Sequence, residues 1–321
     1  MRFYFMVTEH RISPILGAAP VVLIIASEEL QEAYRRGLAH ADFRGEIRFL
    51  GHGLAHGDVE QHVSDPRLEV VVNVPGAAGD LAFSQSAIAA GKHVYEAEST
   101  FQTVEHLRGL AAAADRAGVV FGSGPDTVLG ATVRTAAAVL ADGELGTIAG
   151  IEVGVPARVE GDPLWERKLR CALAALMVLL GESGPGAEAL DENEGGCPRG
   201  TLPSGARIRM PETFDGDRES GGLILEGSEG GRLRLGGLLH YDRDVEWDPE
   251  GTGRWEAVDR GLRPTTDRAG RLFRGPGVVE LLGHLNGGPH RTAGVRAAEV
   301  LELCEQMRAA ASMRTGRHSD V

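Results

Sequence analysis

The chain has 321 residues, enough for two domains with cores of their own, and its formal net charge is −13, with 33 Lys and Arg against 46 Asp and Glu. This acidic balance argues against nucleic acid and anionic membrane surfaces as partners. The longest apolar stretch, 172–180, is far too short to cross a membrane, so no membrane association is expected.

Cysteine usage and the N-terminal residues bear on the cellular compartment. The three cysteines, Cys171, Cys197 and Cys304, lack the spacing of a metal site or a redox pair. The opening segment RFYFMVTEHR becomes polar too early for a signal peptide. We therefore expect a cytoplasmic protein with reduced thiols and no metal site.

Residues 1–124 predict a domain in which strands and helices alternate. In the clearest segment, 68–95, an apolar strand ends at Pro75, Asp80 is placed to cap a helix, and Gly91 ends that helix before a further short strand. Apolar runs predict strands at 2–7, 21–26, 46–50, 68–74, 92–95 and 119–122. Amphipathic stretches predict helices at 28–41, 58–64, 80–90 and 103–117. This order predicts an α/β fold with a Rossmann-like, doubly wound parallel sheet, a common frame for nucleotide sites.

Residues 125–321 predict a second, α+β domain. It begins with a crossover helix at 125–142, continues with an apolar helix that contains Cys171, and then has a Gly- and Pro-rich loop at 184–205. Strand signals follow at 206–210, 222–226, 232–239, 244–247 and 254–258. These short strands indicate an open, mostly antiparallel sheet, and a C-terminal helix closes the chain.

Four segments together resemble the Gfo/Idh/MocA family of NAD(P)-dependent, sugar-type dehydrogenases. They are LEVVVNVPGAAGDLAFSQSAIAAGKHVY (68–95), GSGPDTVLG (122–130), AAVLADGELGTI (137–148) and the C-terminal stretch 289–318. The resemblance implies the two-domain fold predicted above and a second-domain sheet that forms oligomers. Fewer residues than in the family lie between 155 and 171 and around 240–250, which implies a reduced second domain.

In the family the first strand leads into a glycine-rich turn that binds the cofactor's pyrophosphate. Matched without a gap, that turn is 8–13, which contains no glycine and carries a negative charge at Glu9. A phosphate site rebuilt from Arg11 and His10 is the alternative, because arginine binds phosphate well. Glu28 is the candidate for the family's ribose-binding acid, although Glu28 following Ser27 also suits the start of a helix.

Two further positions differ from what the resemblance implies. The family's substrate-polarising lysine matches Glu98, which reverses its charge. The acid/base histidine matches Cys171, in the apolar stretch CALAALMVLL. A thiol there is either a catalytic group or an ordinary core residue.

The remaining acidic residues leave one chemical alternative open. Glu98 follows a strand at the edge where such sheets bind ligands, and Asp126 lies in the loop that the family places beside the cofactor–substrate junction. Paired carboxylates in a cleft can transfer protons without a nicotinamide. The structural alternatives are that Asp126 caps the crossover helix and Glu98 is a solvated loop residue.

These departures together predict that no cofactor binds and that redox activity is lost. The protein is then a non-catalytic partner subunit or a ligand-binding protein. One alternative is a cofactor-independent lyase, isomerase or cyclase acting through Glu98, Asp126 or Cys171. Another is an NAD(P)-dependent oxidoreductase that binds its cofactor through Arg11 and Glu28. We also expect a homodimer, or a heteromer with an intact family member, formed through the second-domain sheet.

Overall fold

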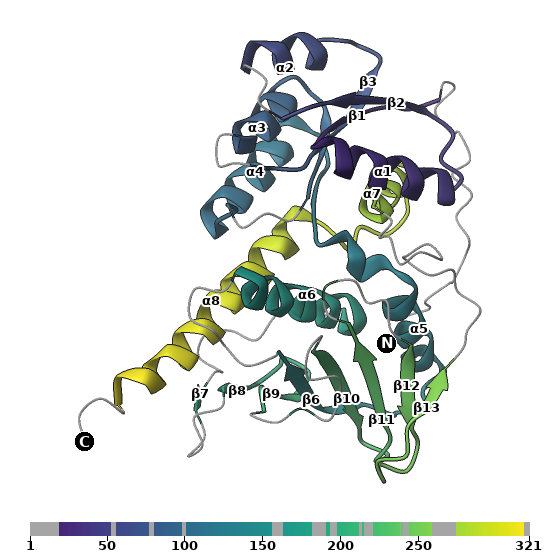
Figure 1. Ribbon diagram of the computed structural model, residues 1–321, viewed down its shortest axis with the longest axis vertical. Helices are drawn as coiled ribbons and strands as arrows, with labels where there is room; N and C mark the ends of the chain where they lie inside the picture. Colours follow the sequence, from purple (N-terminus) through teal and green to yellow (C-terminus); the bar gives the residue numbers. More distant parts are fainter. Residues whose placement is uncertain are drawn as a thin grey trace. The chain divides into compact units, whose positions relative to one another are not determined.

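A computed structural model describes residues 19–52, 56–76, 80–97, 101–155, 163–181, 191–192, 198–211, 214, 221–237, 239, 244–258 and 274–317 (Figure 1). These residues form two compact units. The first unit comprises 19–127 and 274–298, and the second comprises 128–258 and 299–317. Segment 274–298, which the sequence boundaries place in the second domain, therefore belongs to the unit with the parallel sheet.

The first unit is built on a five-stranded parallel sheet with the order β2-β1-β3-β4-β5. Its strands are β1 (Val21–Ile25), β2 (Glu46–Leu50), β3 (Leu68–Asn73), β4 (His93–Glu96) and β5 (Phe121–Ser123). All five residues of β1 and nearly all of β3 are buried, as expected for strands covered on both faces. The predicted doubly wound α/β sheet is confirmed.

Helices lie on both faces of this sheet (Figure 1). They are α1 (Glu28–His40), α2 (His56–Val63), α3 (Leu81–Ala89), α4 (Val104–Ala117) and α7 (Pro276–Leu285). Residues of α1 and α7 pack with β1, β3 and β4 in one apolar cluster that includes Leu38, Val72 and Leu281. The α4 prediction is confirmed because its end signals are local: the Thr103 side chain accepts a hydrogen bond from the His106 amide, and Gly118 ends the helix at φ 68°.

The pairing of β1 changes the strand assignment made from the sequence. That assignment made 21–26 the second strand after a first strand at 2–7. In the structure β1 is paired on one side with β2 and on the other with β3, so no room remains between them for another strand. The chain leaves β1 toward β2 and then crosses to β3, which makes the β1–β3 border the point where strand order reverses. β1 therefore holds the place of the first strand.

The second unit contains an eight-stranded mixed sheet with the order β13-β12-β11-β10-β6-β9-β8-β7. Its strands are β6 (Ile148–Gly154), β7 (Asp191–Glu192), β8 (Pro198–Thr201), β9 (Arg207–Arg209), β10 (Gly222–Gly227), β11 (Arg232–Gly236), β12 (Val245–Asp248) and β13 (Glu256–Val258). Among the described strands of this second sheet, only the β6–β9 pair is parallel, so the sheet is mostly antiparallel as expected. β7 and β8 lie within the stretch 184–205 that the sequence predicts to be a loop, because β8 pairs with β9 and β7 with β8.

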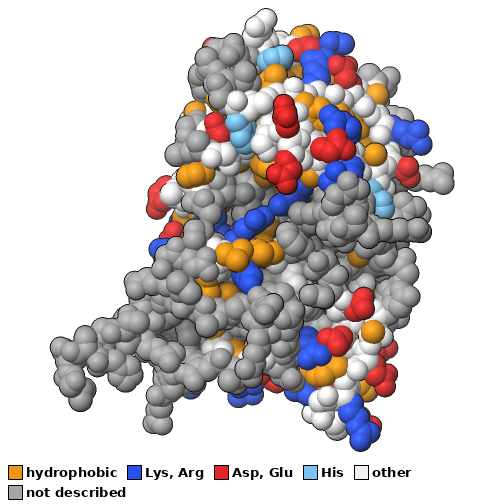
Figure 2. Space-filling view, viewed as in Figure 1, with side chains coloured by type: hydrophobic (Ala, Val, Ile, Leu, Met, Phe, Trp, Pro, Cys, Tyr) orange, Lys and Arg blue, Asp and Glu red, His pale blue; other side chains and the backbone are white. Residues whose placement is uncertain are grey.

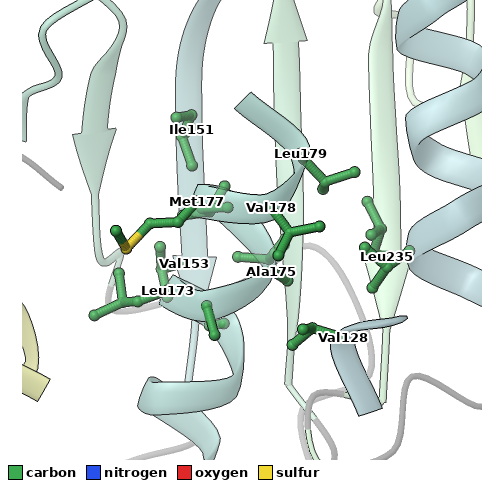
Figure 3. Packing of buried hydrophobic residues seen from close by; sticks show 14 of the residues in the cluster. Val128, Ile151, Val153, Leu173, Ala175, Met177, Val178, Leu179 and Leu235 are labelled. Atoms are coloured by element: carbon green, nitrogen blue, oxygen red, sulfur yellow. The ribbon is translucent and has the colours of Figure 1, made fainter. Parts of the chain in front are cut away.

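One face of this sheet packs against helices. The helices of this unit are α5 (Ala131–Asp142), α6 (Pro163–Leu180) and most of α8 (Gly294–Arg317). Figure 3 shows Leu173, Met177 and Val178 of α6 lying against strand residues such as Ile151 and Leu235. This cluster is the main core of the unit. No helix among the described residues has both the length and the hydropathy needed to cross a membrane.

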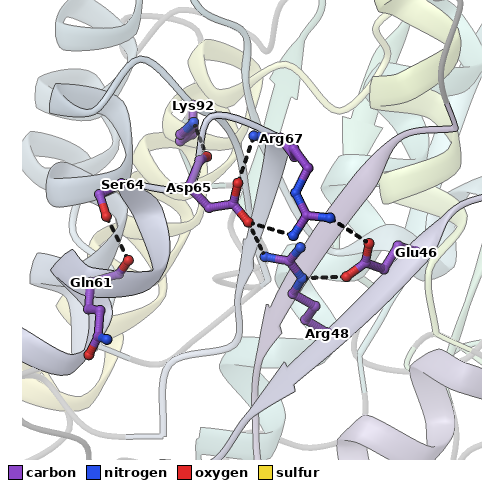
Figure 4. Close-up of polar contacts among 7 residues, drawn as sticks. All are labelled: Glu46, Arg48, Gln61, Ser64, Asp65, Arg67 and Lys92. Atoms are coloured by element: carbon purple, nitrogen blue, oxygen red, sulfur yellow. Dashed lines mark hydrogen bonds and ion pairs between the residues drawn. The ribbon is translucent and has the colours of Figure 1, made fainter.

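The edge of the parallel sheet at β2 carries a network of ion pairs (Figure 4). The Asp65 carboxylate pairs with the guanidinium groups of Arg48 at 2.7 Å and Arg67 at 3.2 Å. The Arg48 guanidinium also pairs with the Glu46 carboxylate at 2.6 Å. The Lys92 ammonium donates to the Asp65 carbonyl oxygen at 2.8 Å, which ties the turn before β3 to the start of β4. On the face drawn in Figure 2, acidic and basic side chains are interspersed. Charged side chains of this kind protect an exposed edge strand from pairing with another chain.

Candidate functional site

Polar side chains gather at the carboxyl edge of the parallel sheet. β3 ends at Asn73, β4 at Glu96 and β5 at Ser123, and the three residues are in register across neighbouring strands. All three are buried, with Asn73 and Glu96 fully so. Because ligands of open α/β sheets bind outside the carboxyl ends of the strands, this row forms the floor of the candidate site.

Glu96 is held at this edge by three side chains. Its Oε1 accepts from Gln102 Nε2 at 2.8 Å and contacts His106 Nε2 at 3.0 Å. Its Oε2 accepts from the Ser84 hydroxyl. Such a set of donors satisfies a buried carboxylate, which would otherwise be costly to remove from water. Glu96 thereby links β4 to α3 and to the start of α4.

Asn73 and Asp80 organise the neighbouring turn. Asn73 Nδ2 donates to the Asp80 carbonyl oxygen at 2.9 Å and to Ser84 Oγ at 3.0 Å. Asp80 precedes α3 as predicted, but its side chain makes no capping bond to that helix and instead accepts from the Gly76 amide at 2.9 Å. The carboxylate therefore stabilises the turn after β3.

Asp126, expected as a proton-transfer group or a helix cap, serves a different purpose. It is 3% exposed, and its two carboxylate oxygens accept separate bonds, from Arg274 Nη1 at 3.0 Å and from the Gly275 amide at 2.9 Å. Arg274 and Gly275 directly precede α7. Asp126 thus fixes the start of α7 against the end of β5.

The turn between β1 and α1 occupies the place of the pyrophosphate-binding turn, because it follows the first strand at the switch point. This turn, Ala26–Gln31, contains no glycine, and Glu28 and Glu29 are exposed in the first turn of α1. Gln31 Nε2 donates to the carbonyl oxygens of Ala26 (2.9 Å) and Leu50 (3.0 Å), tying the ends of β1 and β2 together. These residues do not fit a pyrophosphate held on open glycine backbone. Glu28 lies at the start of α1 and not after the second strand, where the ribose-binding acid was expected.

Cys171 is placed in the middle of α6 with 1% of its surface exposed. Its neighbours along the helix, Ala172 to Leu179, are all buried in the aliphatic core of the second unit. This environment supports the core alternative over a catalytic thiol, because reactive cysteines lie in electropositive and partly exposed surroundings.

Two of the predicted site residues, Arg11 and Glu98, lie outside the described residues, as does the turn 8–13. The sequence pattern does not predict the side chains that contact Glu96 (Ser84, Gln102 and His106) or its neighbours in the row, Asn73 and Ser123. One signal is present in the sequence: each of the three strands ends with a polar residue. The contacts of Ser84 and His106 had no such signal, because they come from helices after β3 and after β4. No cluster of three or more potential metal ligands occurs in the described part of the chain.

Comparison with protein-family profiles and with curated protein sequences finds no match. Solved structures with the same fold are found. The chain is similar to the aldose-aldose oxidoreductase from Caulobacter crescentus complexed with glycerol, with a TM-score of 0.67, 15% identity, and coverage of 92% of this chain and 98% of that one. It is also similar to the inositol dehydrogenase homolog from Azotobacter vinelandii complexed with NADH and myo-inositol, with a TM-score of 0.65, 15% identity, and coverage of 92% and 96%.

A second structure of that homolog is complexed with NAD+ and has a TM-score of 0.62 with 15% identity, over 92% of this chain and 96% of that one. These complexes contradict the expectation that no cofactor binds, which was wrong because it was inferred from missing motif residues and not from the fold. The resemblance seen in the sequence is confirmed at the level of the fold. This chain has the two-domain fold of the Gfo/Idh/MocA-type oxidoreductases.

Proposed function

We propose that this protein binds a nicotinamide dinucleotide at the carboxyl edge of its parallel sheet and acts as a non-catalytic partner subunit or ligand-binding protein. The structures complexed with NADH and NAD+ support the ligand class. The row of Asn73, Glu96 and Ser123 supports the location, because it lies where open α/β sheets bind ligands.

The buried state of Cys171 carries the proposal that the protein is non-catalytic. The sequence match places the family's acid/base group at this position. A side chain that is 1% exposed among aliphatic residues has no access to a substrate proton. The family's route of proton transfer is therefore closed at this position.

The two acidic residues at the start of α1 support a low affinity for the dinucleotide. Glu28 and Glu29 are exposed at a helix N-terminus, where the helix dipole would otherwise favour phosphate. Their charges oppose the pyrophosphate, so other groups must supply most of the binding energy. Modest affinity suits a regulatory or partner role better than steady turnover.

The alternative acid/base enzyme is less well supported. Of its three candidate groups, Asp126 has both oxygens engaged by Arg274 and Gly275, Cys171 is buried, and Glu98 lies outside the described residues. The other alternative is an NAD(P)-dependent oxidoreductase with a rebuilt cofactor site, and the experiment below distinguishes it from the proposal.

The outer face of the second sheet supports a partner subunit. One row across its strands reads Arg209, Glu152, Ile224, Arg234 and Glu246, in register on neighbouring strands. Ile224, at the centre of this row, is buried within the single chain, whereas Arg209 at one end is exposed and Glu246 at the other is partly exposed. When the row is turned about a two-fold axis that runs along the strands at Ile224, Arg209 of each copy faces Glu246 of the other. A self-complementary row of this kind suits an isologous dimer, as C2 symmetry requires.

The proposal is tested by titrating the full chain with NAD+, NADH, NADP+ and NADPH in a calorimeter. The same protein is then incubated with NAD+ and myo-inositol, and NADH formation is followed by absorbance. We expect saturable binding of at least one dinucleotide and no NADH formation. Steady NADH formation would instead favour the rebuilt oxidoreductase, and the absence of any binding heat would overturn the proposed ligand.

A further inference from the structure

Two tyrosine hydroxyls are buried in the first unit without a hydrogen-bond partner among the described residues. They belong to Tyr34 on α1 and Tyr95 on β4, which are 1% and 0% exposed. A buried hydroxyl without a partner loses the bonds it makes to water, at a cost of about 1–3 kcal/mol. Two such losses at one place call for a physical explanation.

Both side chains converge on the segment that begins α7. Tyr34 lies three residues before Gly37 on one face of α1, and a Cβ at Gly37 would lie 1.6 Å from the Arg274 carbonyl oxygen. A Cβ at Gly277 would lie 2.3 Å from the Tyr95 hydroxyl oxygen. The two rings and Val278 of α7 belong to one packed cluster. The Tyr95 hydroxyl therefore lies beside the first turn of α7, and Tyr34 on α1 packs in the same cluster as that helix.

Asp126 brings a carboxylate to the same place. It bonds to Arg274 and Gly275 in this segment, so each of its oxygens has accepted only one hydrogen bond. An ionised carboxylate can accept about four. Burial raises the pKa of both tyrosines, and the charge of Asp126 raises both further, which fits a carboxylate near both hydroxyls.

We propose that Tyr34, Tyr95 and Asp126 together form an internal binding site for one water molecule, which bridges α1, β4 and Asp126, three residues beyond the end of β5. A buried water typically makes about three hydrogen bonds to protein groups that would otherwise be unsatisfied. Here the water accepts from both tyrosine hydroxyls and donates to Asp126. The water would join these three side chains, which make no described hydrogen bond to one another.

The sign of a stability change tests this site. The variants Tyr34→Phe, Tyr95→Phe and the double variant remove hydroxyls and keep the rings. If water bridges the hydroxyls, each single variant lowers the thermal midpoint, by roughly 2–4 °C for a domain of this size. The double variant then lowers it by less than the sum, because both variants disrupt one bridge. If the hydroxyls have no partner, each variant raises the midpoint or leaves it unchanged, and the proposal fails.

A high-resolution crystal structure of the full chain separates water from other partners. Electron density for a single oxygen within hydrogen-bond distance of both hydroxyls and of Asp126 supports the site. A protein side chain at that point, or continuous apolar packing, overturns it.

Discussion

Buried carboxylates in this protein are bonded to specific neighbours, and that decides what each can do. Glu96 accepts from Ser84, Gln102 and His106, while Asp126 accepts from Arg274 and Gly275. Charge-assisted bonds of this kind are the stronger class of hydrogen bond, so these groups contribute to the arrangement of the site. The exposed acids Glu28 and Glu29 place two negative charges at the N-terminus of α1, where they oppose the approach of an anion.

The first prediction concerns those two acids. The double variant Glu28→Gln/Glu29→Gln should tighten NADH binding by roughly 3- to 30-fold, since a charge near a helix N-terminus contributes about 0.3–1 kcal/mol. Calorimetry at low ionic strength measures the effect, and added salt should reduce it. Glu250→Gln, in a turn of the second unit, is the control and should leave affinity unchanged. Equal affinities for the double variant and the wild type would place the pyrophosphate away from α1.

Cys171 gives a second prediction at this scale. Cys171→Ala should cost about 1 kcal/mol of unfolding free energy, because it removes a packed sulfur from the core. NADH affinity should not change. Urea denaturation and calorimetry check the two parts, and a large loss of binding with the fold intact would show that the thiol has a functional role.

His290 makes stability depend on pH. Burial lowers its pKa to about 4, opposed in part by Glu280, and His284 and Arg296 lower it further. Below about pH 6.5 the unfolded chain takes up a proton here that the folded chain does not, so stability falls between about pH 6.5 and about 4. In His290→Gln, urea midpoints measured across this range should fall less steeply with acid. Parallel slopes in the two proteins would contradict this assignment.

At the scale of elements, close contacts between helix and backbone set how the first unit packs. α1 approaches the segment before α7 so closely that only glycine fits at position 37, where the Arg274 carbonyl oxygen would lie 1.6 Å from a Cβ. Gly109 in α4 is the opposite case, with no atom within 4 Å of a Cβ built there. The two helical glycines therefore have different physical roles.

Those glycines form a matched pair of variants. Gly37→Ala should destabilise the protein by about 1–3 kcal/mol or more, because backbone must move to admit the methyl group. Gly109→Ala should stabilise it by about 0.5–1 kcal/mol, because alanine loses less conformational entropy in a helix. Urea unfolding of both variants decides the matter. If the two changes have the same sign, the close contact at Gly37 is not rigid.

For the whole molecule, the question is whether the second-unit sheet joins two copies. Its outer face carries alternating charges that already pair within the chain, as Arg234 does with Glu246 at 2.8 Å. The same row is complementary to itself about a two-fold axis, so pairing between copies would extend an existing network. The heteromer with an intact family member remains the second form of the same proposal.

The assembly prediction uses charge reversal. Light scattering of the wild type should give about twice the 34.0 kDa chain mass. Arg209→Glu should shift the population toward monomer, because a glutamate there would face Glu246 of the other copy across the two-fold axis. Arg308→Glu, on α8, is the control and should leave the mass unchanged. A wild type that is monomeric alone and with co-expressed relatives would end the partner-subunit proposal.

The sequence by itself determined the elements whose signals are local. Thr103 and Gly118 mark the ends of α4, the apolar run from Leu68 marks β3, and the alternation of such elements was enough for the α/β class and the resemblance to the family. Only the tertiary structure decided which strand stands first, because hydrogen bonding between β1 and β3 joins residues far apart in the chain. That pairing moved the expected phosphate turn from 8–13 to Ala26–Gln31. It also decided that Asp126 binds Arg274, 148 residues away, since no local pattern encodes a contact made by packing.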